Sequence, residues 1–337
     1  MSTRLHVPFI ATLLAGCVLT IGAPGYAALC ATPGQDGGTS GAPISLSGII
    51  NTYYPGTSSV AAGATSIQVG SPSGTSTPIA SGNLLLVIQM QDASIDPSNS
   101  STYGDGVASD PANGWTSLNG AGTYEYVVAQ GPVSGGWVPI RGKGANGGLL
   151  FAYTNAAFGT QGQRRFQVIR VPQYNYARVS TTPPTALAWN GSVGGVLALD
   201  VAYRLDIPTD ASRTMTVTGL GFRGGGGRFL SGASGSGLLN TDYRSLASLN
   251  ANGSKGEGIA GTPRWVRTSD TAAASDTGAE GYPQGSHARG APGTAGGGGT
   301  DGNPAGANDR NTGGGGGGNG GSGGKGGNAW SAPAEVT

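Results

Sequence analysis

Residues 84–91 read Leu-Leu-Leu-Val-Ile-Gln-Met-Gln, and this stretch decides the fold. Its first five residues are apolar at odd and even positions alike, so both faces of the strand that they predict must be covered. Other short strand-like runs, separated by turn residues, occupy 44–54, 65–69, 124–128 and 166–171. Beyond residue 27, no stretch shows the spacing of an amphipathic helix. We therefore predict an all-β sandwich or barrel-like domain over 44–180, with 84–91 as a central strand.

The segment after this domain, 181–219, has the most regular alternation in the sequence. Every odd position from Val196 to Ile207 is apolar or aromatic, whereas the even positions include charged residues. Met215 and Val217 repeat the pattern among threonines. Successive side chains of a strand point to opposite faces, so a period of two predicts half-buried strands with the odd positions inward. Short strands without intervening helices are typical of a solenoid coil or a sandwich edge, and we expect 181–219 to form β-solenoid-like strands.

The N-terminus has the features of an export signal. Arg4 precedes a mostly apolar stretch, Val7–Ile21, and Ala23–Ala27 ends in a small-x-small pattern typical of signal-peptidase cleavage. This predicts a signal peptide over 1–27 and a linker over 28–43. A lipoprotein box ending in Cys17 is the alternative, in which lipidated Cys17 would become the mature N-terminus. The apolar stretch is too short to span a membrane, and we expect no transmembrane helix in the mature chain.

Glycine dominates the last part of the chain, 220–337. The chain holds 66 glycines in 337 residues, and glycine loses more backbone entropy on folding than any other residue, so disorder is one interpretation. The alternative rests on a spacing of three within a glycine tract, at Asn319, Ser322, Lys325 and Asn328. In a polyglycine II helix with three residues per turn, these side chains share one edge and glycine forms the other two. Such bare edges would let neighbouring helices bond through their backbones.

Charge and residue content argue against several function classes. Charged residues make up 10% of the chain and the net charge is +1, so the sequence has no basic footprint for nucleic acid. Gly219–Gly224 matches a dinucleotide fingerprint and Gly320–Gly324 a hydrolase elbow, but neither is followed by the helix that its motif needs. Beyond residue 27, His287 is the one histidine, and the glutamates Glu125, Glu257, Glu280 and Glu335 stand alone. We therefore predict no catalytic residues and no cofactor.

Two residue groups remain as weak binding candidates. Four aspartates share the polar loop 92–121, and calcium prefers such oxygen ligands: Asp92, Asp96, Asp105 and Asp110. Because their spacing matches no known calcium loop, a solvated acidic loop is the alternative. Five aromatic residues could stack on sugars or serve as packing anchors: Trp115, Trp137, Trp189, Trp265 and Tyr282.

Several blocks together resemble the N-terminal region of large secreted surface proteins of Gram-negative bacteria. The blocks are Gly48–Gly56, Asn83–Asp92, Phe166–Tyr174, Gly219–Arg228 and Lys255–Pro263. Proteins of that family carry immunoglobulin-like repeats of unknown function toward the C-terminus. The resemblance implies a location on the outer cell surface, and it leads us to expect further repeat domains after Thr337.

We expect a secreted or cell-surface structural or adhesion-type protein without catalytic activity, whose partner is a surface ligand or glycan. One alternative is an extracellular β-helix polysaccharide lyase or glycoside hydrolase, which needs two carboxylates across a cleft. Another is an ice- or mineral-binding protein, which needs a flat, regular array of threonine or asparagine side chains.

Overall fold

The computed structural model describes residues 31–94, 117–157, 162–209, 214–225 and 256–262, together with two short strands at 265–267 and 275–276. The remaining positions include several that the sequence singles out: Cys17, Asp96, Asp105, Asp110, Asn319, Ser322, Lys325 and Asn328. The predictions for these residues, and for most of the glycine-rich region, therefore lie outside the described residues. Within those residues the fold is all-β, as predicted; one short 3-10 helix spans Ala145–Gly147.

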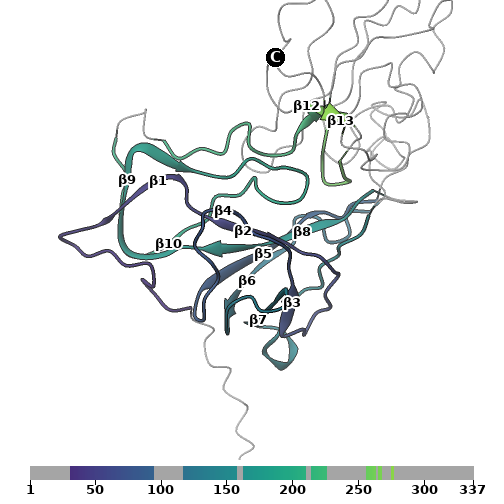
Figure 1. Ribbon diagram of the computed structural model, residues 1–337, viewed down its shortest axis with the longest axis horizontal. Coiled ribbons are helices and arrows are strands. Elements are labelled where there is room, and N and C mark those ends of the chain that lie inside the picture. Colours follow the sequence, from purple (N-terminus) through teal and green to yellow (C-terminus); the bar gives the residue numbers. More distant parts are fainter. Residues whose placement is uncertain are drawn as a thin grey trace, which may run out of the picture.

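An antiparallel seven-stranded sheet forms the body of the molecule and curls into a half-barrel (Figure 1). Its order is β3-β7-β6-β5-β8-β2-β4. The strands are β2 (Thr52–Pro55), β3 (Ser66–Gln68), β4 (Ser73–Gly74), β5 (Leu84–Gln91), β6 (Tyr124–Ala129), β7 (Trp137–Arg141) and β8 (Arg165–Val171). The β5 bounds coincide with the stretch 84–91, which predicts a central strand.

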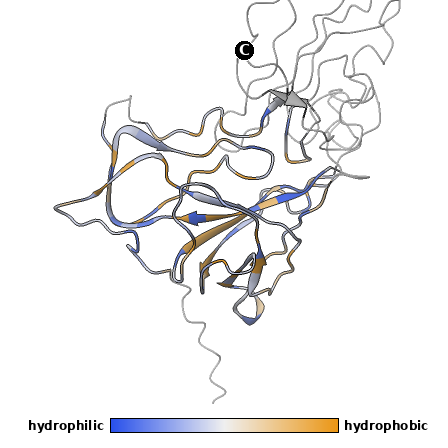
Figure 2. Cartoon of the chain, viewed as in Figure 1, coloured by the Kyte–Doolittle hydropathy of each residue, from blue (hydrophilic) through white to orange (hydrophobic). Residues whose placement is uncertain are grey.

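Strand β5 lies in the middle of this sheet and is covered on both faces, which confirms the prediction. Leu85 and Val87 are fully buried in the cluster inside the curl. Leu86 lies on the opposite face with Tyr53 and Ile169, in a second buried cluster. Burying a large apolar side chain contributes about 1.5–3 kcal/mol, so the two faces together fix this strand at the centre. Figure 2 shows hydrophobic colouring along the middle of the sheet.

A second sheet consists of three parallel strands, β1 (Ile44–Ile49), β9 (Gln173–Thr185) and β10 (Asp200–Asp206), with β9 in the middle. The single run predicted over 44–54 is therefore wrong, because β1 pairs with β9 and β2 with β8. The register of β1 shifts between Leu46 and Gly48, and Gly48 has φ +60°, a conformation that favours glycine. The chain changes sheets after this irregularity.

The alternation over 196–207 is also realised differently from the prediction. Only 200–206 is a strand, and the odd positions Tyr203 and Ile207 are 72% and 55% exposed. Ala198, at an even position, is buried. No residue of β10 is fully buried, because this segment is an edge strand, and its register against β9 shifts between Val201 and Arg204. Three parallel strands in one layer do not establish a solenoid, and that prediction is not confirmed.

Two further parts of the chain complete the described structure. A small antiparallel sheet contains β11 (Gly224–Gly225), β12 (Trp265–Arg267) and β13 (Ser275–Asp276). At the other end of the sequence, the stretch assigned to a linker contacts the main sheet before β1 begins. The Asp36 carboxylate accepts hydrogen bonds from the Arg170 guanidinium at 2.6 Å and from the backbone N–H of Gln173 at 2.7 Å. The first described residues are thereby tied to β8 and β9.

Candidate functional site

A groove of about 500 Å³ opens on the outer face of the half-barrel. Its lining comes from β5 and β6, from the segment before β10, and from residues 215–217. The lining residues are Ile88, Gly122, Tyr124, Gly195, Val196, Leu197, Met215, Thr216 and Val217. None of these side chains is charged, so the groove suits a neutral ligand.

The sheet supplies one wall of the groove. Ile88 of β5 and Tyr124 of β6 are direct partners across the antiparallel ladder, so their side chains stand on the same face. Leu86 and Tyr126 form the next such pair. Residues 187–198, which we call the covering segment, pack on this face and bury Leu86. Both tyrosines are exposed, at 57% and 45%. The covering segment therefore ends at β5 and leaves two aromatic rings of β6 uncovered beside the groove.

The opposite wall, residues 195–197, is held by two side-chain amides of the main sheet. The Gln167 side chain donates to Gly194 O and accepts from Gly194 N, each at 2.9 Å. The Asn51 side chain pairs with Ala198 in the same way, at 2.6 Å to its carbonyl oxygen and 3.1 Å from its amide nitrogen. We call these two pairs the amide clamps. Both side chains are fully buried, and each clamp satisfies two backbone groups that would otherwise be orphaned.

Gly194 and Tyr53 complete the attachment of this wall. Gly194 has φ +109°, and a Cβ there would lie 2.5 Å from Ala188 O, so only glycine fits at the first clamp. The Tyr53 hydroxyl donates to Val196 O at 2.7 Å and accepts from Leu187 N at 3.2 Å. Burial raises the pKa of Tyr53 to about 12, so this hydroxyl keeps its proton at neutral pH.

Tyr124 and Tyr126 meet edge to face, with ring centroids 6.3 Å apart and an interplanar angle of 86°. Such a T-shaped pair is a favourable arrangement for aromatic rings. Burial, followed by the neighbouring Tyr124 and Asp200, raises the pKa of Tyr126, so its hydroxyl also stays neutral. The groove thus presents aromatic faces and neutral hydroxyls next to an apolar lining.

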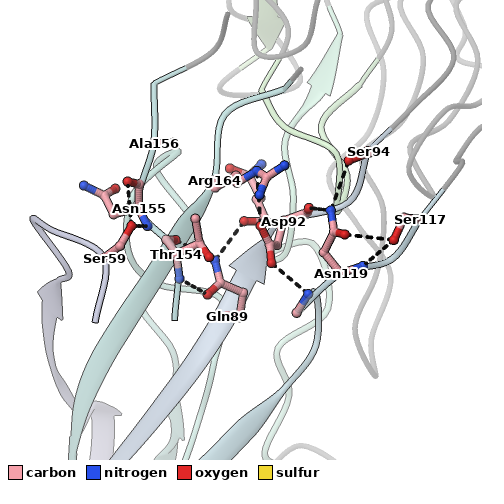
Figure 3. Close-up of polar contacts among 12 residues, drawn as sticks. Ser59, Gln89, Asp92, Ser94, Ser117, Asn119, Thr154, Asn155, Ala156 and Arg164 are labelled. Carbon is pink, nitrogen blue, oxygen red and sulfur yellow. Dashed lines mark hydrogen bonds and ion pairs between the residues drawn. The ribbon is translucent and has the colours of Figure 1, made fainter. Parts of the chain in front are cut away.

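The calcium candidate Asp92 lies elsewhere, just after β5, and its carboxylate already contacts protein groups (Figure 3). One oxygen accepts from Gly120 N at 2.7 Å. The other lies 3.3 Å from Arg164 Nε in an ion pair but accepts no hydrogen bond. Burial raises the pKa of Asp92, and the bond from Gly120 and the charge of Arg164 lower it again in part. Among the described residues, no three potential ligands gather into a metal site.

Asn119 continues the contacts around Asp92. Its side-chain amide donates to Asp92 O at 2.9 Å and to Ser94 Oγ at 3.0 Å, while Ser117 Oγ bonds to its side-chain oxygen at 2.8 Å. Figure 3 shows Asp92 between Arg164 and this group. The cluster therefore closes the base of the loop that the sequence marks as acidic.

The two described glutamates serve the fold. Glu125 accepts hydrogen bonds from the backbone of Leu150 and Phe151 and from the Tyr153 hydroxyl. Burial and the neighbouring carboxylate raise the pKa of Tyr153 above its ordinary range. Since every one of these donors comes from the chain itself, Glu125 is a fixed acceptor that holds the 150–153 loop.

Glu257 is fully buried and fixes a distant segment onto the sheet. The Arg223 guanidinium donates to both of its oxygens, at 2.8 and 2.9 Å. Thr262 Oγ1 and Trp189 Nε1 also donate to it, at 2.6 and 3.3 Å. Gln163 in turn donates to Thr262 Oγ1. This network brings together the glycine-rich blocks around 223 and 257, which lie far apart in the sequence.

The aromatic residues named from the sequence separate into different environments. Trp189 is 2% exposed and packs edge to face on Phe222, so it is a packing anchor. Trp137 is 45% exposed on β7, outside the groove lining. Trp265 is in β12, and Trp115 and Tyr282 lie outside the described residues. Sequence analysis missed Tyr124 and Tyr126; their spacing of two within a predicted strand was the available signal, because it places both rings on one face.

Comparison with protein-family models, curated proteins and solved structures gives no significant match. In the part of the chain that the structure describes, no helix has the length and apolar character needed to cross a membrane.

Proposed function

We propose that this chain is a secreted or cell-surface protein of the adhesion type, which binds a neutral glycan in the groove beside Tyr124 and performs no chemistry on it. The observation that carries the proposal is the combination of an uncharged apolar groove with an exposed aromatic pair at its side. The export signal predicted from the sequence would place this groove in contact with extracellular glycans.

The chemistry of a sugar ring matches this lining. A pyranose has apolar C–H faces and a rim of neutral hydroxyls, so one face packs on an aromatic ring while the rim needs polar partners. Tyrosine combines a large apolar ring with a polar hydroxyl, which is why it is favoured at wet interfaces. Thr216 and the two tyrosyl hydroxyls provide polar groups at the groove. The described lining of the groove offers no cationic side chain to bind a polyanion.

The carboxylates support a binding role over glycoside cleavage. Glycoside hydrolysis needs two acids on either side of the scissile bond. The groove lining contains no carboxylate, and Glu125 and Glu257 are occupied by hydrogen bonds from the chain. A ligand held in this groove would therefore meet no pair of acids among the described residues.

The test is binding to an array of neutral oligosaccharides, followed by calorimetry with the best glucan, mannan or galactan. We expect Tyr124→Ala to weaken binding about tenfold or more, because one stacking contact is lost with its buried area. Tyr124→Phe should retain most of the affinity. Trp137→Ala is the matched control, since it removes a similarly exposed aromatic ring from another strand.

Two results would overturn the proposal. One is the absence of binding to any neutral glycan on the array. The other is an equal loss of affinity in Tyr124→Ala and Trp137→Ala, which would mean that binding does not use the groove. Shortening of the bound oligosaccharide during incubation would refute the non-catalytic part of the proposal and leave the binding site standing.

A further inference from the structure

Strand β10 (Asp200–Asp206) is an edge of the parallel sheet: within the described ranges it pairs with β9 and with no other strand. An edge strand presents unpaired N–H and C=O groups along its free side, and these groups can accept another strand. Proteins often blunt such edges with lysine, proline, a β-bulge or a covering loop. The register of β10 against β9 shifts between Val201 and Arg204, so the regular part of this edge is Arg204–Asp206. The side chains in and beside this regular part form a pattern that is complementary to itself.

Two large apolar side chains beside the regular part of β10 are exposed. Tyr203 is 72% exposed, and Ile207, one residue past the strand, is 55% exposed. The Tyr203 ring stacks on Tyr176 of β9, with centroids 5.3 Å apart and an interplanar angle of 22°. This contact fixes the direction of the ring while leaving most of it open. Large apolar side chains exposed together on an edge often mark an interaction surface.

The regular part of β10 carries an exposed ion pair. Arg204 Nε lies 2.9 Å from an Asp206 carboxylate oxygen, and the side chains are 60% and 43% exposed. A carboxylate has two oxygens and a guanidinium has five N–H donors, so both groups can take a second partner. The charges of Arg204 and Asp206 therefore remain available to an incoming strand.

A second copy of β10 is complementary to the first in one antiparallel register. When Leu205 lies opposite Leu205 of the second copy, Arg204 lies opposite Asp206 and Tyr203 lies opposite Ile207. The Leu205 pair lies on the two-fold axis, and the other two pairs each occur twice because the axis exchanges the copies. The neighbouring registers are unfavourable: pairing about Tyr203 sets Asp200 against Asp206, and pairing about Arg204 sets two arginines together.

We propose that two copies of this chain associate through β10, in an antiparallel pair centred on Leu205. The pair joins two three-stranded sheets into one six-stranded sheet. It covers Tyr203 and Ile207 in each copy and surrounds the two Arg204–Asp206 pairs with opposite charge. This interface uses a different part of the chain from the glycan groove, so the two proposals stand or fall separately.

Sedimentation equilibrium on the full chain tests the proposal, with three charge variants. The wild-type chain should form a dimer whose dissociation constant rises with salt concentration, because four charges meet at its centre. Arg204→Asp places two acidic side chains at positions 204 and 206, and Asp206→Arg places two basic side chains there. Each should dissociate at least about tenfold more readily, because opposing residues across the pair then carry like charge.

Complementation makes the test specific for the register. An equimolar mixture of Arg204→Asp and Asp206→Arg should form a heterodimer, since each acidic strand then faces a basic one. The double variant, with both charges exchanged, should recover the wild-type dissociation constant. Both substituted positions are exposed, and unchanged thermal unfolding will verify that the variants are folded.

A monomeric wild-type chain at all concentrations tested would overturn the proposal. So would two single variants that dimerise as well as the wild type, or a mixture that stays monomeric. Tyr124→Ala should dimerise like the unchanged chain, which separates this interface from the proposed glycan site.

Discussion

Replacing Gln167 with leucine should detach one wall of the groove. The Gln167 side chain is fully buried and makes two hydrogen bonds, both with the backbone of Gly194. Leucine has a similar volume but cannot bond, so the N–H and C=O of Gly194 would remain buried without partners. Each orphaned group costs about 1–3 kcal/mol, and leucine recovers some apolar contact, so we expect a net loss of about 3 kcal/mol.

Two measurements check this expectation. Urea unfolding gives the total loss, and amide hydrogen exchange shows whether residues 187–198 open before the sheet does. Gln130→Leu is the matched control, because Gln130 is exposed and should change stability by less than about 0.5 kcal/mol. A Gln167→Leu loss below about 1 kcal/mol, with unchanged exchange over 187–198, would refute the role that we assign to the amide clamp.

The buried Arg223–Glu257 pair and the exposed Arg204–Asp206 pair have similar geometry, at 2.8 and 2.9 Å, so their comparison isolates burial. Arg223→Met should destabilise the chain by about 3–5 kcal/mol because it leaves the buried Glu257 charge unpaired. Arg204→Met should cost under about 1 kcal/mol. Urea unfolding of the dilute monomer measures both losses, and equal losses would contradict the effect of burial. Burial in the folded chain raises the pKa of Asp92 above its ordinary value of 3.8. Between pH 3.8 and this raised pKa, the unfolded chain binds fewer protons than the folded chain, so the stability of the fold falls as pH rises. Asp92→Asn removes that titration, so the variant should gain stability relative to the parent chain as pH increases through this window. Urea unfolding at several pH values measures the difference, and a relative gain for the parent chain would contradict the raised pKa.

The central part of the fold could be predicted because its signal is local. Leu84–Ile88 is apolar on both faces, and burial on both faces is what the structure shows. The 44–54 run could not be divided correctly, since β1 and β2 are equally strand-like and only their different partners separate them. Similarly, the period of two at Tyr203 and Ile207 predicts a strand but does not reveal which of its faces meets the core.

The buried polar residues were beyond prediction for another reason. Asn51 bonds to Ala198, 147 positions away, and its partner there is the peptide group. A peptide group has no signature in the sequence, so nothing near either position announces the contact. The sequence gives no partner for Glu257, because its buried bonds to Arg223, Trp189 and Thr262 depend on the completed fold. The groove has the same origin, because its two walls come from separate layers.

The amide clamps have a consequence for how this chain can evolve. A side-chain amide recognises the main chain at Ala198 whichever residue stands there, so neighbouring positions can accumulate substitutions while the layer keeps its place. Asn51 and Gln167 are not interchangeable with apolar residues in this way, and Gly194 is held by its backbone angle. Distant relatives should therefore retain these three positions long after the rest of the covering segment has diverged beyond recognition.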